Sequence, residues 1–346
     1  TYITVDKYEE SLEIQIDNGD ILFVKTGSTL GKSALVSNIK EKATINPQVV
    51  VLRTPDVLQK IVSVILTSSQ SQKQISEVKI GGAVPTLTET EIKKIIINLP
   101  QNEVEQEKIG RFFQSIDDTI ALHQDAIQRQ QDLKKALLQK LFPVNGERIP
   151  TVRFATFKEE WEQRKFFDNI QNTIDFRGRT PKKLGMDWSE SGYLALSALN
   201  VKNGYIDPSA DAHYGNEELY KKWMGGRELR KGQVLFTTEA PMGNVAQVPD
   251  NQGYILSQRT ITFDVNDEKI TDDFLAVLLR SPNVFNDLSA LSSGGTAKGV
   301  SQRSLSGLKV IVPKNLCEQK KIGLFFKQLD STIALHLCKQ QQFESL

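Results

Sequence analysis

The segment closest to a catalytic motif lies at residues 26–33, TGSTLGKS, and is similar to a phosphate-binding P-loop. In a P-loop a glycine-rich turn presents backbone N–H groups to phosphate, which requires a glycine five residues before Gly31. Thr26 stands at that position instead. We therefore expect no nucleotide hydrolysis here. The alternatives are a glycine-bearing surface turn and a loop whose side chains face nucleic acid.

Other groups that do catalysis are sparse in this chain. Three histidines are present, and His213 has no recognisable nucleophile or metal partner nearby in sequence. The adenine-methyltransferase signature Asn-Pro-Pro-Tyr/Phe is absent, because Asn46 and Pro47 are followed by Gln48. A helicase P-loop and a nuclease cluster of carboxylates with lysine are also missing. We predict no catalytic residue and no metal site in this chain.

The remaining chemistry is hydrogen bonding from side-chain donors in glycine- and proline-bearing loops. Gln258 and Arg259 are the most specific pair, because Gln and Arg form bidentate bonds to adenine and guanine edges. Basic clusters often belong to solvated loops, and the net charge of +1 does not by itself indicate a nucleic-acid-binding protein. A further basic cluster surrounds Trp223 and consists of Lys221, Lys222 and Arg227. The candidate DNA-binding residues are Lys25, Ser28, Thr29, Lys32, Gln48, Arg177, Arg179, Lys182, Lys183, Gln258, Arg259, Lys298, Gln302 and Arg303.

A long helix at residues 102–142 is the clearest element that positions these loops. Asn102 is its expected cap, Glu105 is placed to reach back to the cap, and Pro143 ends it. Such a helix is about 60 Å long and cannot bury an apolar stripe against itself, so it needs a partner helix. The stripe has the heptad spacing of a coiled-coil seam. Its members are Ile109, Phe113, Ile116, Ile120, His123, Ile127, Gln130, Lys134, Leu137 and Leu141.

The partner helix is a repeat of the first at the end of the chain. Residues 105–123 recur at 318–336 with thirteen of nineteen positions identical and an offset of 213. The cap recurs as Asn315 with Glu318, and we expect the two helices to pair antiparallel. His123 and His336 fall at equivalent seam positions, where a polar residue sets register. The second seam consists of Ile322, Phe326, Leu329, Ile333, His336, Gln340 and Phe343.

The repeat continues upstream of both helices and therefore sets the domain organisation. Residues 19–23 match 232–236, 81–82 match 294–295 and 95–100 match 308–313. A one-residue slip then aligns Gly31 with Gly243 and Val36 with Val248, and Gln48 corresponds to Gln258. The predicted boundaries are residues 1–101 for the first domain, 102–142 for the central helix, 143–314 for the second domain and 315–346 for the final helix.

The predicted fold class is α+β, with two mixed α/β domains joined by two long helices that form an antiparallel coiled coil with internal pseudo-two-fold symmetry. In the first domain we expect strands at 20–25, 34–36, 48–53 and 95–99 and a helix at 56–68. Because the second domain opens near Arg153, the offset leads us to expect about sixty further residues before Thr1.

Composition is that of ordinary globular protein, with 39% hydrophobic and 25% charged residues. The longest apolar run, residues 61–66, is too short to span a membrane, so a cytoplasmic location is expected. Cys317 and Cys338 both lie in the final helix, where a disulfide is geometrically excluded, and we expect packed thiols.

Taken in order, these motifs resemble one family. In both copies the segment that leads into the long helix reads Pro-x-x-x-x-Glu-Gln-x-Lys-Ile, at 100–109 and 313–322. The second copy opens with motifs at 153–164 and 176–181. This arrangement resembles the specificity subunit of type I restriction-modification enzymes over nearly the whole chain.

The resemblance implies two target-recognition domains that each read half of a split site in double-stranded DNA. It also implies two methyltransferase subunits that methylate adenine and restriction subunits that cleave, a system of phage defence. No cofactor is expected in this chain, because S-adenosylmethionine, ATP and Mg would be bound by those partners. The helix length of about 60 Å sets an upper scale of roughly 17 base pairs for the half-site separation.

Two other classes remain open from the sequence. One is a coiled-coil adaptor whose domains bind protein, which a salt-dependent affinity for DNA would exclude. The other is an enzyme whose catalytic part has been removed, although about sixty residues are too few for a methyltransferase domain.

Overall fold

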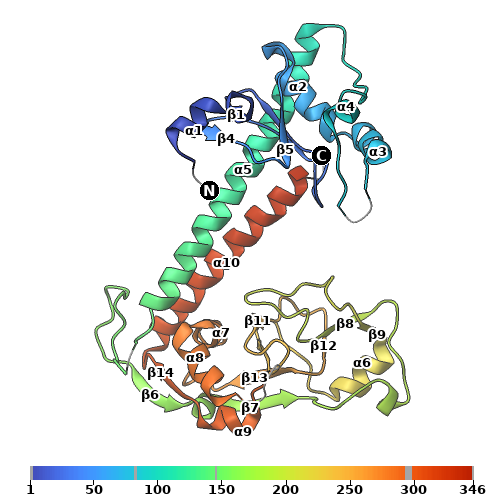
Figure 1. Ribbon diagram of the computed structural model, residues 1–346. Coiled ribbons are helices and arrows are strands. Elements are labelled where there is room, and N and C mark those ends of the chain that lie inside the picture. Colours follow the sequence, from blue (N-terminus) through green and yellow to red (C-terminus); the bar gives the residue numbers. More distant parts are fainter. Residues whose placement is uncertain (1–2, 82–83, 145, 293–297, 345–346) are drawn as a thin grey trace. The chain divides into compact units, whose positions relative to one another are not determined.

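The computed structural model describes residues 3–81, 84–144, 146–292 and 298–344. The chain forms two compact units (Figure 1). Unit 1 comprises residues 1–123 with 340–346, and unit 2 comprises residues 124–339. Within the described ranges, no helix is both long and apolar enough to cross a membrane.

Unit 1 is built on a three-stranded antiparallel sheet in the order β3-β2-β5. Burial alternates along β2, as it does when one face of a strand meets a core. Ile21 and Phe23 are fully buried and pack with Val62 and Leu66 of α2. The elements are α1 (Val5–Glu10), η1 (Leu12–Ile14), β1 (Gln15–Ile16), β2 (Ile21–Val24), β3 (Ser33–Leu35), β4 (Ala43–Thr44), β5 (Val49–Leu52), α2 (Asp56–Thr67), α3 (Ser69–Val78) and α4 (Glu89–Ile92).

Unit 2 contains a four-stranded antiparallel sheet in the order β11-β10-β13-β7, covered on both faces. Every residue of β10 is buried, with Val234 and Phe236 in one core and Leu235 in another. The sheet thus separates two cores.

The elements of unit 2 are listed here in chain order. They are β6 (Glu162–Lys165), η2 (Phe166–Asn169), β7 (Ile170–Asp175), η3 (Lys182–Leu184), β8 (Tyr193–Leu196), β9 (Tyr214–Gly215), α6 (Glu217–Met224), β10 (Val234–Thr237), β11 (Val245–Gln247), β12 (Ile255–Leu256), β13 (Thr260–Val265), α7 (Asp272–Arg280), α8 (Pro282–Leu291), α9 (Gln302–Gly307) and β14 (Lys309–Val312).

Two long helices, α5 (Glu103–Lys140) and α10 (Leu316–Glu344), run side by side and antiparallel (Figure 1). In unit 2, Leu141 just beyond the end of α5 shares a core with Ile322 near the start of α10. Further along, Lys134 forms an ion pair with Asp330, which also accepts a 2.7 Å bond from Arg280. Contacts that move back along α5 therefore move forward along α10, as predicted.

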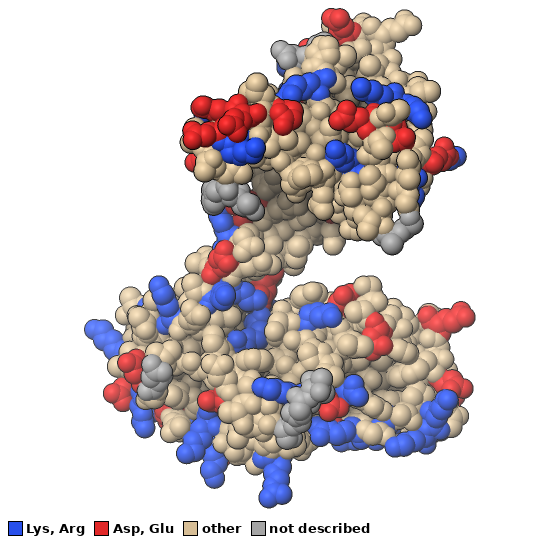
Figure 2. All heavy atoms as spheres, in the orientation of Figure 1, with Lys and Arg blue, Asp and Glu red and all other residues tan. Residues whose placement is uncertain are grey.

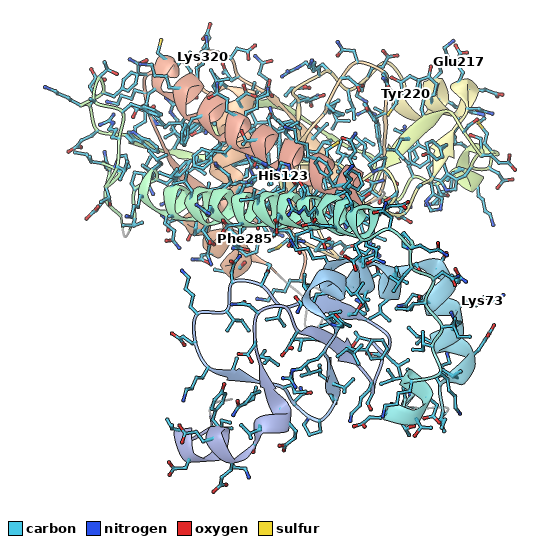
Figure 3. All side chains as sticks on the ribbon, turned by 90° about the horizontal axis from the view of Figure 1, so that it is seen from above. Lys73, His123, Glu217, Tyr220, Phe285 and Lys320 are labelled. Atoms are coloured by element: carbon cyan, nitrogen blue, oxygen red, sulfur yellow. The ribbon has the colours of Figure 1, made fainter. Side chains whose placement is uncertain are left out.

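The predicted seam is the inward face of both helices. None of its positions is exposed, and Ile127 and Ile333 are at most 9% exposed. Leu122 and Leu335, which lie off the seam, are 68% and 54% exposed. His123, labelled on α5 in Figure 3, stacks on Phe343 of α10 with ring centroids 6.2 Å apart. The coiled-coil prediction is confirmed.

Each long helix is joined to its unit by the same glycine contact. A Cβ on Gly110 would lie 2.7 Å from Cβ of Lys60 in α2. A Cβ on Gly323 would lie 2.6 Å from Cβ of Asp273 in α7. Both residues of the second pair stand 213 positions after those of the first. The sequence offset therefore corresponds to a repeated contact between a short helix and a long one.

A glutamine at the start of each long helix makes the same hydrogen bond in both copies of the repeat. The Gln106 side chain donates to the Pro100 carbonyl at 2.6 Å, and Gln319 donates to the Pro313 carbonyl at 2.9 Å. These bonds fix the turn that leads into each long helix.

The start of α10 carries a buried ion pair. Glu318 is 1% exposed and accepts bonds of 2.7 and 2.8 Å from the Arg153 guanidinium and one of 3.3 Å from Nε1 of Trp161. Its carboxylate is therefore bound to Arg153, and the prediction that it reaches back to the cap residue Asn315 is wrong. Asn315 does cap the helix, accepting from the Cys317 N–H at 2.8 Å.

Residues 95–99 do not form the predicted strand. Ile95, Ile97 and Leu99 alternate onto the core of unit 1 as strand residues do, but the backbone of Ile96 bonds the Gln74 side chain at 2.8 and 2.9 Å. The matching segment in unit 2, β14, pairs with β6. Among the described residues of unit 1, residues 95–99 pair with no strand.

Two smaller expectations are also corrected. Phe23 pairs with Val50 and Phe236 with Ile261, so Gln48 corresponds to Arg259 and not to Gln258. Both cysteines are exposed free thiols and not packed ones, because they lie off the seam.

Gly323→Ala is expected to lower the free energy of unfolding by about 1–3 kcal/mol, because the added methyl overlaps the backbone of α7. Gly307→Ala in α9 is the control, since the nearest atom to its Cβ would be 3.9 Å away. Urea denaturation of the two variants tests this. Equal stability of both would mean that the close helix contact is absent.

Arg153→Ala should cost about 3–5 kcal/mol, because it leaves the Glu318 carboxylate buried without its cation. Glu105→Ala, at the exposed equivalent position in α5, should change stability by less than about 0.5 kcal/mol. Replacing Arg153 and Glu318 together by methionine should recover at least half of the loss. Thermal and urea unfolding measure all three, and a loss below about 1 kcal/mol for Arg153→Ala would contradict the buried pair.

Candidate DNA interface

The candidate residues of unit 2 gather where β7 and β10 of the four-stranded sheet end and β13 begins, which we call the edge of this sheet. Asp175 at the end of β7 pairs with Ile261 near the start of β13, and Thr237 at the end of β10 pairs with Thr260. Loops that leave β7 and β10 and the loop that enters β13 therefore meet. A bridge between Glu239 and Gly299 adds the segment before α9. Of the glycine-rich segment 294–299, residues 294–297 lie outside the described residues.

Asp175 joins two of these loops. Its carboxylate Oδ2 lies 3.3 Å from an Arg177 guanidinium nitrogen and accepts a 3.1 Å bond from Nε2 of Gln302. Arg177 is exposed, so its remaining donors face solvent. Arg177 and Gln302 are thus held together at the surface, although they are 125 positions apart in the sequence.

Arg179 is engaged within the loop. The Arg179 guanidinium lies 4.4 Å from the centroid of the Phe176 ring and donates to the Trp223 carbonyl. The Arg227 guanidinium lies 4.7 Å from the centroid of the same ring. Burial, and then repulsion from Arg227, lower the pKa of Arg179. Nε2 of Gln258 donates to the Arg179 carbonyl at 2.9 Å. Both side chains hold the loop in place, which leaves Gln258 its Oε1 for a ligand.

The Arg259 side chain, unlike that of Arg179, is exposed and does not bond its own loop. The Arg259 φ of 63° is left-handed, and its carbonyl accepts bonds from Thr238. Nε of Arg259 lies 2.8 Å from the Glu239 carboxylate, and the two side chains are 54% and 47% exposed. An exposed pair contributes little to stability. The contact therefore orients the guanidinium and leaves it available to a stronger acceptor.

Four basic side chains of this set are exposed at the same edge. Lys183 donates to the Gly178 carbonyl at 2.6 Å, whereas Lys182, Lys298 and Arg303 have no side-chain partner among the described residues. Figure 2 shows lysine and arginine side chains along the lower rim of unit 2, where Figure 1 has β7 and α9. Cations without partners are suited to phosphate.

Two cations of the basic cluster around Trp223 are already bonded within unit 2. Lys221 pairs with Glu217 at 2.6 Å, and Lys222 donates to the Leu184 carbonyl at 3.0 Å. It borders the Arg179 loop through Arg227.

Unit 1 has the same edge in its own sheet. The Lys25 N–H donates to the Gln48 carbonyl at 2.8 Å, and the Leu87 N–H donates to the Lys25 carbonyl at 2.8 Å. Thr238 takes the place of Lys25 in unit 2, bonded to Arg259 and Val300 at 2.8 Å each. Lys25 is half-buried, and the exposed candidates around this edge are Ser28, Thr29, Lys32 and Gln48.

Sequence reasoning missed a polar and aromatic cluster next to the edge in unit 2. Nδ1 of His213 lies 3.4 Å from the Asp211 carboxylate, and Oγ of Ser197 donates to that carboxylate at 2.7 Å. The ring of Trp188 lies 5.5 Å from His213. The only sign of this cluster in the sequence was the closeness of Asp211 to His213, two residues later. Ser197 and Trp188 are too far from them in sequence for their contacts to be inferred. Within the described ranges, no three His, Cys, Asp or Glu side chains are grouped as metal ligands.

Comparison with known proteins gives a consistent result. A family model described as the type I restriction modification DNA specificity domain matches residues 3–130 and 158–345. The chain is 24% identical over 345 residues to the type I restriction enzyme MjaVIII specificity subunit of Methanocaldococcus jannaschii, with 96% of this chain and 77% of that protein covered.

Two solved structures share the fold. The S subunit of a type-I restriction-modification system from M. genitalium has a TM-score of 0.66 and 12% identity, covering 96% of this chain and 81% of that one. A chain solved in work on complex assembly and conformational transition of the type I R-M system has a TM-score of 0.50 and 16% identity, with 96% and 80% covered. At these identities the likeness concerns the fold alone.

Arg303→Ala should weaken duplex DNA binding a few-fold for every sequence and reduce the slope of log K against log salt concentration by about 0.9, the value for one phosphate contact. Lys231→Ala is the matched control, because Lys231 is an exposed residue preceding the opposite end of β10. Fluorescence anisotropy at several salt concentrations measures both. An unchanged slope for Arg303→Ala would remove this residue from the interface.

Proposed function

The chain belongs to the family of type I restriction modification DNA specificity domains, and on this premise we propose that its two units each read one half of a split DNA site. The chain is the subunit that recognises DNA sequence and works with other subunits of a type I system. The finer roles below belong to the proposal.

The observation that carries the proposal is the repeated sheet edge. In both units three chain segments meet through the same two backbone bonds, at Lys25 in unit 1 and at Thr238 in unit 2. Each edge presents different side chains, with lysines, hydroxyls and one glutamine in unit 1 and arginines, lysines and glutamines in unit 2. A common scaffold with different donors suits two half-sites of different sequence.

The proposed partners follow from the repeat and from the family. Two methyltransferase subunits would bind two equivalent surfaces, because a quasi-two-fold repeat offers the same contacts twice. Restriction subunits would add cleavage. This chain would be non-catalytic, and S-adenosylmethionine, ATP and Mg would be bound by those partners. Ser197 supports this view, since its hydroxyl bonds Asp211 and not a histidine that could act as its base.

The test of the proposal is single-molecule sequencing of methylated adenine in DNA from cells that express the full-length chain with a methyltransferase subunit. The expected result is a motif of two short half-sites with a fixed unspecified gap. A continuous motif would overturn the assignment of one half-site to each unit. Absence of any motif, with complex formation established, would favour a coiled-coil adaptor that binds protein.

Arg259→Ala should relax sequence preference at one position by roughly tenfold or more, as expected for loss of a bidentate base contact. Arg303→Ala is the comparison, because a phosphate contact should weaken all positions alike. Methylation frequencies across single-base variants of the motif distinguish the two. A uniform loss for Arg259→Ala would make it another phosphate contact and not a base reader.

A further inference from the structure

A cavity of about 400 Å³ lies within unit 2 beside the candidate DNA interface. Its walls come from residues 179–182, 187–188, 197–199, 211, 213, 223, 240 and 257–259. Small-molecule sites in proteins have volumes of this order. Gln258 and Arg259 of the candidate interface also line it, so the cavity adjoins that interface.

One wall of the cavity is aromatic. The ring of Trp188 lies 5.7 Å from that of Trp223 and 5.5 Å from that of His213, between centroids. Trp223 belongs to α6, the helix on which Figure 3 marks Glu217 and Tyr220, and its Nε1 donates to the Leu256 carbonyl at 2.9 Å. With this ring fixed, Trp188 and His213 offer flat faces on which a base can stack.

A second wall carries an ordered set of polar groups. Nδ1 of His213 lies 3.2 Å from the Asp211 carbonyl and 3.4 Å from its carboxylate. Both Asp211 atoms are acceptors, so Nδ1 carries the hydrogen in this contact. Ser197 holds the Asp211 carboxylate at 2.7 Å. The wall therefore presents fixed acceptors to the N–H groups of a base edge.

The rim of the cavity is cationic. Lys182 is exposed and has no side-chain partner in the part of the chain that the structure describes. Arg259 also lines the cavity, and its side chain is paired with the Glu239 carboxylate. Asp187 and Asp211 also line the cavity and oppose an anion, so the phosphate belongs at the rim and not beside the polar wall.

We propose that this cavity binds a single nucleotide. Its base stacks on Trp188 and His213, its edge meets His213 and Asp211, and its phosphate lies at the rim beside Lys182. Two sources share this chemistry: a free nucleotide, and a nucleotide of the bound DNA that leaves the helix stack. The second source rests on the proposed function, and the first does not.

The first experiment is calorimetric titration of the purified full chain with dAMP, dGMP, dCMP and dTMP. Lys182→Ala should weaken binding of the preferred nucleotide about tenfold, as for loss of a charged hydrogen bond, and leave binding of its nucleoside unchanged. Lys231→Ala should stay within twofold, because Lys231 is exposed and does not line the cavity. His213→Ala should weaken nucleotide and nucleoside alike.

The second experiment distinguishes the source. Duplexes that contain the methylated motif carry 2-aminopurine at one position at a time, because this base fluoresces more strongly when it leaves the stack. A rise with the wild-type chain that His213→Ala abolishes assigns the nucleotide to DNA. Binding of mononucleotides without a rise assigns it to a free nucleotide.

The proposal is overturned if duplex DNA binds normally while neither mononucleotide binding nor a fluorescence rise occurs. It is also overturned if Lys231→Ala weakens binding as much as Lys182→Ala. If the chain binds no duplex DNA, the proposed function fails, and the mononucleotide titration still decides the cavity.

Discussion

The close contact between a short helix and a long one is the constraint on which the two units depend. At Gly110 and at Gly323 the absence of a side chain lets the backbone of α2 or α7 reach the long helix. The glutamine four residues earlier bonds the carbonyl of the proline that precedes the helix. A long helix attached in this way takes a defined direction from its unit. In unit 2, the buried ion pair of Arg153 and Glu318 also stabilises the start of the long helix.

The candidate interface follows from strand pairing and not from charge. The chain has a net charge of +1, yet strand ends bring donors together at a single edge in each sheet. Several donors are already used internally: Arg179 and Gln258 hold their loop, and Arg177 shares Asp175 with Gln302. Residues that fix a loop and residues that contact DNA are therefore interleaved. A change at Arg179 would alter the positions of its neighbours as well as a contact.

The sequence was sufficient for the repeat, the seam and the fold class, because heptad spacing and a constant offset are properties of the chain itself. It was insufficient where contacts between distant parts of the chain determine the local structure or the bond that a side chain makes. The segment 95–99 has the alternation of a strand but bonds a side chain, and Glu318 has the spacing of a capping box but binds Arg153. The cluster of Ser197, Asp211 and His213 depends on how distant loops meet. Likewise, residue type identified donors but not which of them are occupied.

The central claim is that each unit specifies its own half of the target. The most direct measurement exchanges residues 143–314 for the equivalent domain of a family member with a different motif and then sequences methylated adenine in cells that also express the methyltransferase subunit. Our account predicts a hybrid motif in which one half-site changes and the other, with its gap, is retained. Alteration of both half-sites, or of neither, would contradict it.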